Sequence, residues 1–293
     1  LRLIKINHNF NYNNYLMNSF RLTFLLLFLS ITNFIFSQQN LNSQFTVVVD
    51  AGHGGKDPGN TGNGYLEKKI ALSIALKLGK KLEDNGVKVV YTRKSDVFVD
   101  LFERANIANR SNAQLFISIH CDSHTSQAYG AGTFVLGLHA NQRNFEVAKK
   151  ENSVIFFEED YINKYEGFDP NNPESVIGLT LMQEEYLDQS IVAASYIQNS
   201  FVNRLKRRNR TVKQAGFIVL KYTYMPSVLV ETGFLTNNSE GAYLNSVRGQ
   251  NEMADAIASA VIDYKNDFFQ NLSTTNLSND RTEYKISYRI QIA

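Results

Sequence analysis

Four residues that could carry metal-assisted chemistry fall where strands of the chain are expected to end. His53 lies three residues past the apolar run 45–50, His120 directly follows the run 115–119, and Glu67 opens an expected helix. Glu231 directly follows the run 227–230. In open α/β sheets, functional side chains gather at the carboxyl ends of the strands. Two imidazoles and one carboxylate make the donor set of a catalytic zinc site and leave the fourth position for water.

The remaining carboxylate, Glu231, is the expected catalytic base. Zinc lowers the pKa of a bound water and polarises the scissile carbonyl, and a carboxylate off the metal can move the proton to the leaving amine. An unpaired glutamate at an apolar strand end would otherwise be costly. Each residue also has an ordinary explanation, because a glycine-loop histidine suits a turn and Glu67 suits the first turn of a helix. The convergence of four such residues on separate strand ends favours the site.

The surrounding pattern predicts the elements that position these residues. Strands are expected at 45–50, 87–91, 115–119, 132–138, 216–220 and 227–230, and helices at 67–82, 101–109, 191–205 and 253–264. This alternation is typical of βαβ units, so we expect an α/β domain with a mainly parallel (mixed) sheet flanked by helices on both faces. The domain is predicted to span 44–267, with a helical insertion at about 141–188 that contains Pro170 and Pro173.

The first 38 residues are expected to be removed from the mature protein. Arg21 precedes the apolar run 22–31, and Ser37 suits a cleavage site, which together indicate a signal peptide that starts at Met17 after upstream residues 1–16. The apolar run is short for a membrane span, although a retained anchor is the alternative. We therefore expect a secreted, periplasmic protein of the cell envelope, with no stable membrane span after cleavage.

Composition narrows the function further. The 293 residues include 43% hydrophobic ones, enough for one sizeable core. Outside the first 38 residues the basic and acidic side chains nearly balance, so no nucleic-acid partner is expected. In the glycine loop 51–64, Lys56 is followed by Asp57 rather than Ser or Thr, which excludes a phosphate-binding loop. The single cysteine, Cys121, allows no internal disulfide.

Several other polar residues are assigned structural roles, with functional alternatives left open. Cys121 is expected to fill space beside the site rather than to act as a nucleophile or fourth ligand. The basic run 206–210 is expected to close a helix rather than to bind a ligand. Structural roles are also expected for two histidines and for a cluster that could instead orient substrate: His124, His139, Arg93, Asp96, Glu103 and Arg104.

Five segments of the chain carry a family resemblance. They are VVVDAGHGGKDPG (47–59), LEK (66–68), YTR (91–93), SIHCDS (118–123) and MPSVLVETGFLTN (225–237). In order and content they resemble the zinc-dependent type 3 N-acetylmuramoyl-L-alanine amidases over residues 46–266. The resemblance implies that His53, Glu67 and His120 bind zinc and that Glu231 is catalytic. It also implies hydrolysis of the amide between the lactyl group of muramic acid and L-alanine in peptidoglycan.

The chain departs from this family pattern in one place and carries a further segment after the matching region. Cys121-Asp122 stands where family members often have Ala-Asn. Residues 268–281 are expected to be a linker, and the alternating segment 282–293 resembles the start of a truncated SPOR domain, a module that binds glycan strands. In some amidases a helix within the region of the insertion blocks the zinc until an activator protein displaces it. Autoinhibition by residues 141–188 is thus one expectation, and a purely structural insertion is the other.

Two alternative functions remain at this stage. A non-catalytic peptidoglycan-binding or regulatory protein could keep the same fold, although the presence of all three ligands and the base speaks against it. A zinc enzyme of this fold could also cleave a different amide within the stem peptide.

Overall fold

The computed structural model describes residues 44–138, 141–176 and 184–279. The expected signal peptide, His139 and the expected SPOR strand lie outside the described residues. Within the described part, no helix has the length and apolar character needed to cross a membrane.

The central element is a six-stranded sheet in the order β4-β1-β5-β8-β6-β7. The first four strands are mutually parallel, β6 runs antiparallel to β8, and β7 runs parallel to β6. The chain thus has the mainly parallel, mixed sheet that the sequence predicts. The strand bounds are β1 (Thr46–Ala51), β4 (Lys88–Tyr91), β5 (Leu115–Asp122), β6 (Ala131–Leu136), β7 (Asn209–Ala215) and β8 (Ser227–Phe234), and a small hairpin pairs β2 (Thr61–Gly62) with β3 (Tyr65–Leu66).

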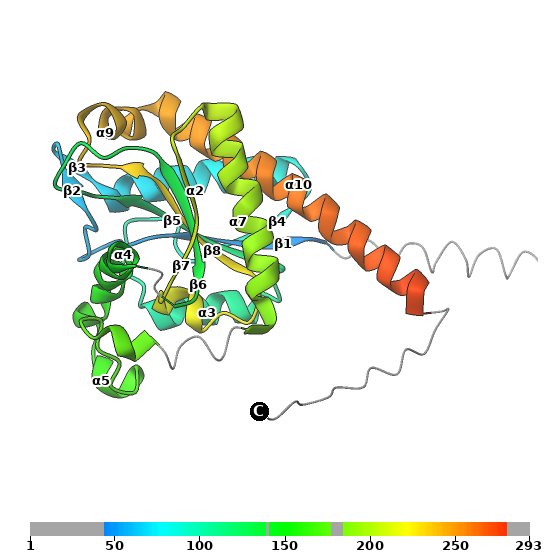
Figure 1. Ribbon diagram of the computed structural model, residues 1–293, viewed down its shortest axis with the longest axis horizontal. Coiled ribbons are helices and arrows are strands. Elements are labelled where there is room, and N and C mark those ends of the chain that lie inside the picture. The colour runs from blue at the N-terminus through cyan, green and yellow to red at the C-terminus, as the bar shows by residue number, and fades with distance from the viewer. Residues whose placement is uncertain (1–43, 139–140, 177–183, 280–293) are drawn as a thin grey trace, which may run out of the picture. The chain divides into compact units, whose positions relative to one another are not determined.

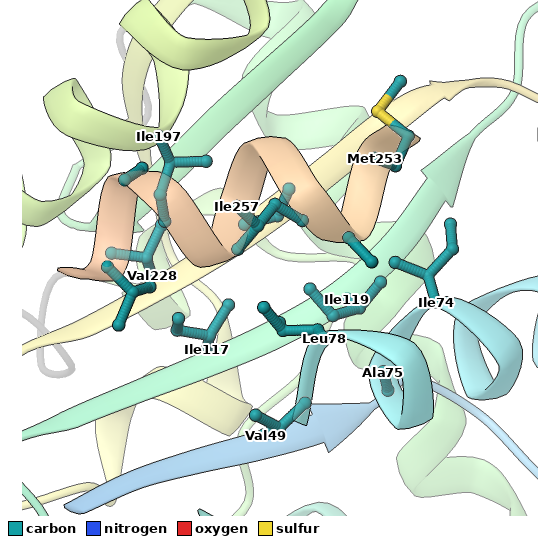
Figure 2. Close-up of a cluster of buried hydrophobic side chains, with 14 of the residues drawn as sticks. Val49, Ile74, Ala75, Leu78, Ile117, Ile119, Ile197, Val228, Met253 and Ile257 are labelled. Atoms are coloured by element: carbon teal, nitrogen blue, oxygen red, sulfur yellow. The ribbon is translucent and has the colours of Figure 1, made fainter. Parts of the chain in front are cut away.

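Helices cover both faces of this sheet (Figure 1). One face packs on α2 (Glu67–Asp84), α7 (Glu184–Leu205) and α10 (Val247–Asn279), and Figure 2 shows Ile117 and Ile119 of β5 meeting Ile257 of α10 in this core. Each fully buried side chain of this size stabilises the fold by about 1.5–3 kcal/mol. The other face packs on α3 (Leu101–Arg110) and α8 (Ile218–Lys221). Because strands such as β1 are buried on both faces, their sequences are largely continuous apolar runs.

The insertion lies against the second face. It consists of α4 (Gln142–Asn152), η1 (Ser153–Phe157), α5 (Tyr161–Lys164) and η2 (Pro173–Val176). Val147 and Ala148 of α4 and Ile155 of η1 join the same core as Phe134 of β6. A further helix, α9 (Asn238–Asn245), follows β8. The insertion is thus packed into the domain along α4 rather than standing apart from it.

Two predicted elements differ in the structure. The strand expected at 216–220 is wrong, because Ile218–Lys221 forms the short helix α8, and β7 lies just before it at Asn209–Ala215. The edge strand β7 is largely polar and so lacks a strand-like apolar pattern, whereas the apolar run after it is buried in the second core. As a result, the basic residues expected to close a helix partly belong to β7.

The second difference concerns the helix predicted at 253–264, which begins earlier and ends later in the structure. The structure continues α10 through Asn279. Phe268 and Phe269 each pack edge-on against Phe45, which extends the buried side of the helix past its predicted end.

Candidate active site

His53 lies in a tightly held loop after β1. Its backbone adopts a left-handed conformation with φ of 60°. Arg104 Nη2 donates to the His53 carbonyl oxygen at 2.8 Å, and Arg93 donates to the carbonyl oxygens of Ala51 and Gly52 at 2.9 and 2.7 Å. Asp57 Oδ2 accepts from His53 Nδ1 at 2.7 Å, which leaves Nε2 as the bare nitrogen. The loop thus fixes both the position and the tautomer of the imidazole.

His120 lies on β5, next to this loop. Its Nε2 is 3.1 Å from Ser118 Oγ, and that hydroxyl donates to Asp50 Oδ2 at 2.6 Å. Because the Ser118 proton is already used, Ser118 accepts from His120 Nε2–H, and Nδ1 of His120 is bare. A Cβ on Gly52 would lie only 2.4 Å from the His120 ring, so only glycine permits this close approach.

Glu67 is the first residue of α2 and is fully buried. The Asn60 amide donates to its Oε2 at 2.7 Å, and the Cys121 amide donates to its Oε1 at 2.8 Å. A Cβ on Gly59 would lie 2.5 Å from the His53 ring and 2.8 Å from Glu67 Oε2. These contacts aim Glu67 Oε1 at the two histidines.

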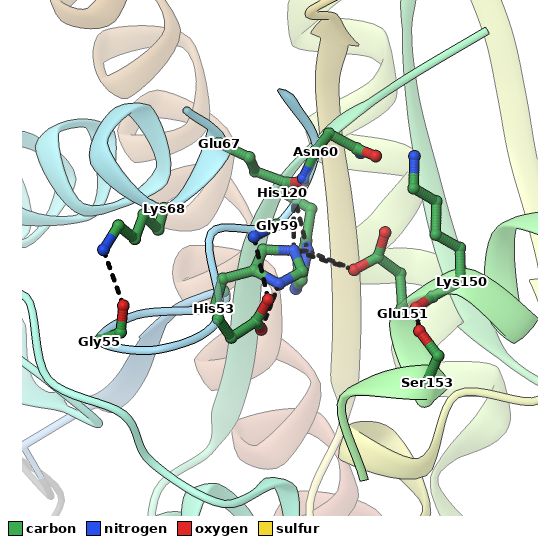
Figure 3. Close-up of polar contacts among 12 residues, drawn as sticks. His53, Gly55, Gly59, Asn60, Glu67, Lys68, His120, Lys150, Glu151 and Ser153 are labelled. Carbon is green, nitrogen blue, oxygen red and sulfur yellow. Dashed lines mark hydrogen bonds and ion pairs between the residues drawn. The ribbon is translucent and has the colours of Figure 1, made fainter. Parts of the chain in front are cut away.

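The structure adds a fourth residue, Glu151 of α4, which the sequence did not single out. Glu151 reaches from the insertion toward the two imidazoles (Figure 3). Its Oε2 lies 3.1 Å from His53 Nε2 and 3.0 Å from His120 Nδ1, and Glu67 Oε1 lies 3.1 Å from each of the same nitrogens. The two bare nitrogens are 3.2 Å apart. All four donor atoms lie within 4.8 Å of one another.

These spacings fit a metal ion rather than hydrogen bonds alone. Ligands held tetrahedrally about 2.0 Å from zinc are about 3.3 Å apart. The two nitrogens are 3.2 Å from each other and 3.0 to 3.1 Å from each carboxylate oxygen. Two imidazole nitrogens that both lack protons have no hydrogen bond to share. When both nitrogens lack protons, the buried Glu151 Oε2 has no hydrogen-bond donor within the described part of the chain, although it lies within ion-pair distance of both imidazoles. The donor set therefore fits a divalent cation at its centre.

The electrostatics point the same way. Burial alone would lower the pKa of both imidazoles, but Glu67 and Glu151 raise the pKa of His53 well above its usual value and Glu151 raises that of His120 to about 10. Burial opposes the ionisation of Glu151, yet His120 lowers the pKa of this carboxyl to about 2. The carboxylates of Glu67 and Glu151 thus favour a positive charge between them, and a bound cation would supply that charge.

Glu231 stands in register with His120 across β5 and β8. Register partners on neighbouring parallel strands point to the same face, so both side chains lie on the α3 face of the sheet. Glu231 is fully buried, and neither carboxylate oxygen has a hydrogen-bond partner among the described residues. Burial, with the nearby Asp122, Glu151 and Glu67, raises its pKa well above the usual value. Unlike Glu67 and Glu151, Glu231 is not one of the four donors.

The other polar residues weighed from the sequence have structural contacts. Arg93 and Arg104 hold the His53 loop, and Asp96 accepts from the Gly55 amide at 2.8 Å. Cys121 Sγ is buried 3.2 Å from Thr232 Oγ1. His124 bonds Ser126 Oγ through Nδ1 at 2.7 Å. None of these side chains belongs to the group of four donors.

Glu151 was missed because its local sequence, KKEN, is that of an exposed helix end. Further along the insertion, Glu158 has a structural contact, because it accepts from the Leu101 amide at the start of α3 at 2.8 Å. The one sequence signal available for Glu151 is its spacing from Val147 and Ala148, which lie four and three positions earlier on the same helix face.

Two buried histidines and the glutamates that face them, grouped at the strand ends of a mixed α/β sheet, are typical of metal-dependent hydrolases. The model of the N-acetylmuramoyl-L-alanine amidase family matches residues 47–263. The chain belongs to that family.

Individual relatives agree with this assignment. The amidase AmiA of Escherichia coli is 34% identical over 223 residues, which cover 74% of this chain and 75% of the relative. The amidase AmiC2 of Nostoc punctiforme superposes with a TM-score of 0.57 at 30% identity, covering 76% of this chain and 97% of the other. The CwlD amidase of Clostridioides difficile, solved in complex with the GerS lipoprotein, has a TM-score of 0.57 at 27% identity and covers 76% and 99%.

Proposed function

We propose that the chain is a zinc-dependent hydrolase that cleaves the amide between the lactyl group of N-acetylmuramic acid and L-alanine in peptidoglycan, for cell-wall remodelling or daughter-cell separation. The observation that carries the proposal is a set of three donors, His53, Glu67 and His120, beside the unpaired buried carboxylate of Glu231. The amidase relatives and the family match support the choice of bond.

Zinc is the metal that this donor set favours. Two imidazole nitrogens and a carboxylate at tetrahedral spacing are typical of catalytic zinc, whereas Mg²⁺ and Ca²⁺ prefer six or more oxygen ligands. When bound, the ion supplies polarisation of the scissile carbonyl and a lowered pKa for the attacking water.

Glu231 is the proposed proton carrier. As a carboxylate it accepts the proton of the attacking water, and as a carboxylic acid it delivers that proton to the nitrogen of the leaving L-alanine. Its buried surroundings raise its pKa, which makes the protonated form stable enough to act as the acid. Asp57 and Ser118 hold the two imidazoles in the tautomers that the site requires.

The described conformation is proposed to be a resting state. Glu151 takes the fourth position that a catalytic site leaves for water, so α4 must move before substrate can bind. Asn152 fastens the end of α4, because its Nδ2 donates to the Gly216 carbonyl at 2.7 Å and its Oδ1 accepts from the Ile218 amide at 2.9 Å. An activator protein is the proposed agent of displacement. The half-exposed Phe156 and Phe157 of η1 and the exposed Ile162 of α5 give it apolar surface on the insertion.

The proposed substrate also indicates the compartment in which the protein acts. Peptidoglycan lies outside the cytoplasmic membrane, so the proposed activity requires export to the periplasm through the signal segment predicted at 17–37. The SPOR segment predicted at 282–293 would add affinity for glycan strands. Deleting each segment separately and imaging the tagged protein would show whether the first is needed for export and the second for placement at the septum.

Digestion of purified peptidoglycan tests the activity directly. Full-length protein with added zinc should release stem peptides that begin with a free L-alanine amine, identified by mass spectrometry. Chelation or Glu231→Gln should abolish release, whereas the exposed control Glu83→Gln should not. Binding without cleavage, both by the wild type and by Glu151→Gln, would instead support a non-catalytic wall-binding protein. Products cut within the stem would identify a different amide.

A further inference from the structure

A bulge in β7 turns one arginine toward the active site. Ala131 of β6 pairs with Asn209 and Thr133 pairs with Val212, so Arg210 and Thr211 together face the single residue Gly132. Thr211 has φ of 65°, a conformation that β-branched residues rarely adopt. Strain of this kind persists where the surrounding structure enforces it, and it often accompanies a functional position.

Gly132 links this arginine to the proposed base. It pairs with Glu231 on β8 and faces Arg210 on β7, so the three residues stand side by side on adjacent strands. The three strands, β8, β6 and β7, can be followed in Figure 1. A Cβ on Gly132 would lie 3.2 Å from Arg210 Cβ and 3.9 Å from its Cζ. The missing side chain leaves the space along which Arg210 lies over the sheet.

The guanidinium of Arg210 is buried but incompletely paired. Its side chain is 8% exposed, Nη2 donates to Asp122 Oδ2 at 2.5 Å, and Cζ lies 4.2 Å from the centre of the Phe234 ring. Nη1 is buried without a hydrogen-bond partner in the described part of the chain. Arg143 of α4 reaches the same Asp122 oxygen at 3.3 Å but, being a donor, cannot satisfy Nη1. The helix that closes the site therefore covers Arg210 without pairing it.

A second cation strengthens the positive charge. Lys213 follows on the same strand, with its Nζ 5.3 Å from the centre of the Phe134 ring, and burial together with Arg210 lowers its pKa to about 8. Asp122 is the one carboxylate within ion-pair distance of Arg210 and Arg143 among the described residues. The cluster of Arg143, Arg210 and Lys213 thus carries more positive charge than the paired Asp122 balances.

An orphaned guanidinium N–H beside an ammonium and over an aromatic ring suits a carboxylate ligand. Asp122, which anchors Arg210, lies two residues beyond His120 on β5, or about 7 Å along the strand. In the stem peptide, the second residue is a glutamate joined through its side-chain carboxyl, so its α-carboxylate is free. That group lies two residue lengths from the scissile carbonyl, again about 7 Å. A groove of about 960 Å³ opens beside Asp122, the ion-pair partner of Arg210, and is also lined by Arg143 and Lys150 of α4.

We propose that Arg210, supported by Lys213, binds the free α-carboxylate of the stem-peptide residue that follows the scissile L-alanine. The inference rests on the proposed function, because it assumes that this amide is cleaved at the donor set. It makes Arg210 a specificity residue: substrate whose second residue is isoglutamate should be preferred over substrate in which that carboxylate is amidated.

Two matched disaccharide tripeptides, one with D-isoglutamate and one with D-isoglutamine at the second position, test this preference. Zinc-loaded full-length protein, in the wild-type and Glu151→Gln forms, should cleave the acidic substrate with the higher kcat/KM. Arg210→Gln should lower kcat/KM for the acidic substrate about tenfold or more, chiefly through KM, and leave the amidated substrate nearly unchanged. Arg210→Lys should lie between the two, and the exposed control Arg208→Gln should change neither value.

The results that would contradict the carboxylate assignment differ from those that would contradict the amidase proposal. Equal rates on both substrates in the parent proteins, or equal losses on both in Arg210→Gln, would overturn the carboxylate assignment while leaving the amidase proposal intact. No cleavage of either substrate by both zinc-loaded parents would contradict the proposed function itself, and this inference with it. If Arg210→Gln does not fold, Lys213→Gln serves in its place, with the same selective loss expected and an unselective effect as the contrary result.

Discussion

At the scale of single residues, each proposed ligand depends on a neighbour that fixes its orientation. Asp57 accepts from His53 Nδ1 at 2.7 Å and is itself buried. Carboxylates in this position hold the ring and raise its basicity, and their loss typically costs 10–100-fold in metal affinity. Asp57→Asn should therefore weaken zinc binding by about that factor, as measured by competition with a chromophoric chelator. The exposed control Asp84→Asn should bind zinc like the wild type, and an unchanged affinity in Asp57→Asn would argue against this role.

Glu151 is the residue whose removal should increase activity. Glutamine in its place keeps the side-chain size but removes the negative charge that faces the two imidazoles. We expect Glu151→Gln to raise basal amidase turnover, by about tenfold for every 1.4 kcal/mol by which the closed state is weakened. Release of stem peptides from peptidoglycan would measure the effect. Glu146→Gln, an exposed position on the same helix, is the control, and turnover at or below wild type in Glu151→Gln would contradict the resting-state proposal.

The difference between Glu151 and the other site residues shows what the sequence could and could not predict. His53 follows β1, and His120 and Glu231 lie toward the carboxyl ends of β5 and β8. The carboxyl ends of parallel strands meet at one edge of the sheet. Their proximity could thus be predicted from local patterns alone. Glu151 lies on an insertion helix whose position depends on long-range packing against β7 and α8, which no local spacing encodes. The charge of its neighbours even suggested an exposed position.

At the scale of elements, the closed state depends on how α4 is fastened to the domain. Asn152 makes two buried hydrogen bonds to the connection between β7 and α8. Asn152→Ala would leave the Gly216 carbonyl and the Ile218 amide without these partners, at about 1–3 kcal/mol each. We expect a lower Tm together with higher basal amidase activity, since the lost contacts belong to the closed position of the helix. Asn163→Ala, on the exposed α5, should change neither, and a loss of Tm without a gain in activity would show that Asn152 only supports the fold.

The arrangement of the elements also explains why β7 and α8 differ from the predicted elements. Parallel strands buried on both faces, such as β1 and β5, appear as unbroken apolar runs and were placed correctly. The edge strand β7 has one polar side, so its sequence resembled a loop, and the buried run after it resembled a strand. At the edge of the sheet and in the insertion, tertiary packing overrides the structure that the local sequence pattern favours.

At the scale of the whole molecule, the buried charges link stability to pH and to metal. The pKa of His120 is raised from 6.5 to about 10, so its stabilising contribution is fully present below pH 6.5 and is lost as the pH rises toward 10. The metal-free protein should thus lose Tm over this range, and a thermal melt at each pH would measure the loss. Zinc-loaded protein should lose less, because the metal replaces the protons. An equal loss in metal-free wild type and His120→Gln would contradict this assignment.

The fourth donor from α4 also bears on how the proposed site would retain a bound metal. A resting site with four protein donors is closed in the manner of a structural zinc site, in which water does not compete for the ion. Withdrawal of α4 would remove one donor at the same moment as it admits substrate. Activation would then trade retention of zinc for turnover, so an idle enzyme would keep its ion in zinc-poor surroundings while a working one became sensitive to scavengers of the metal.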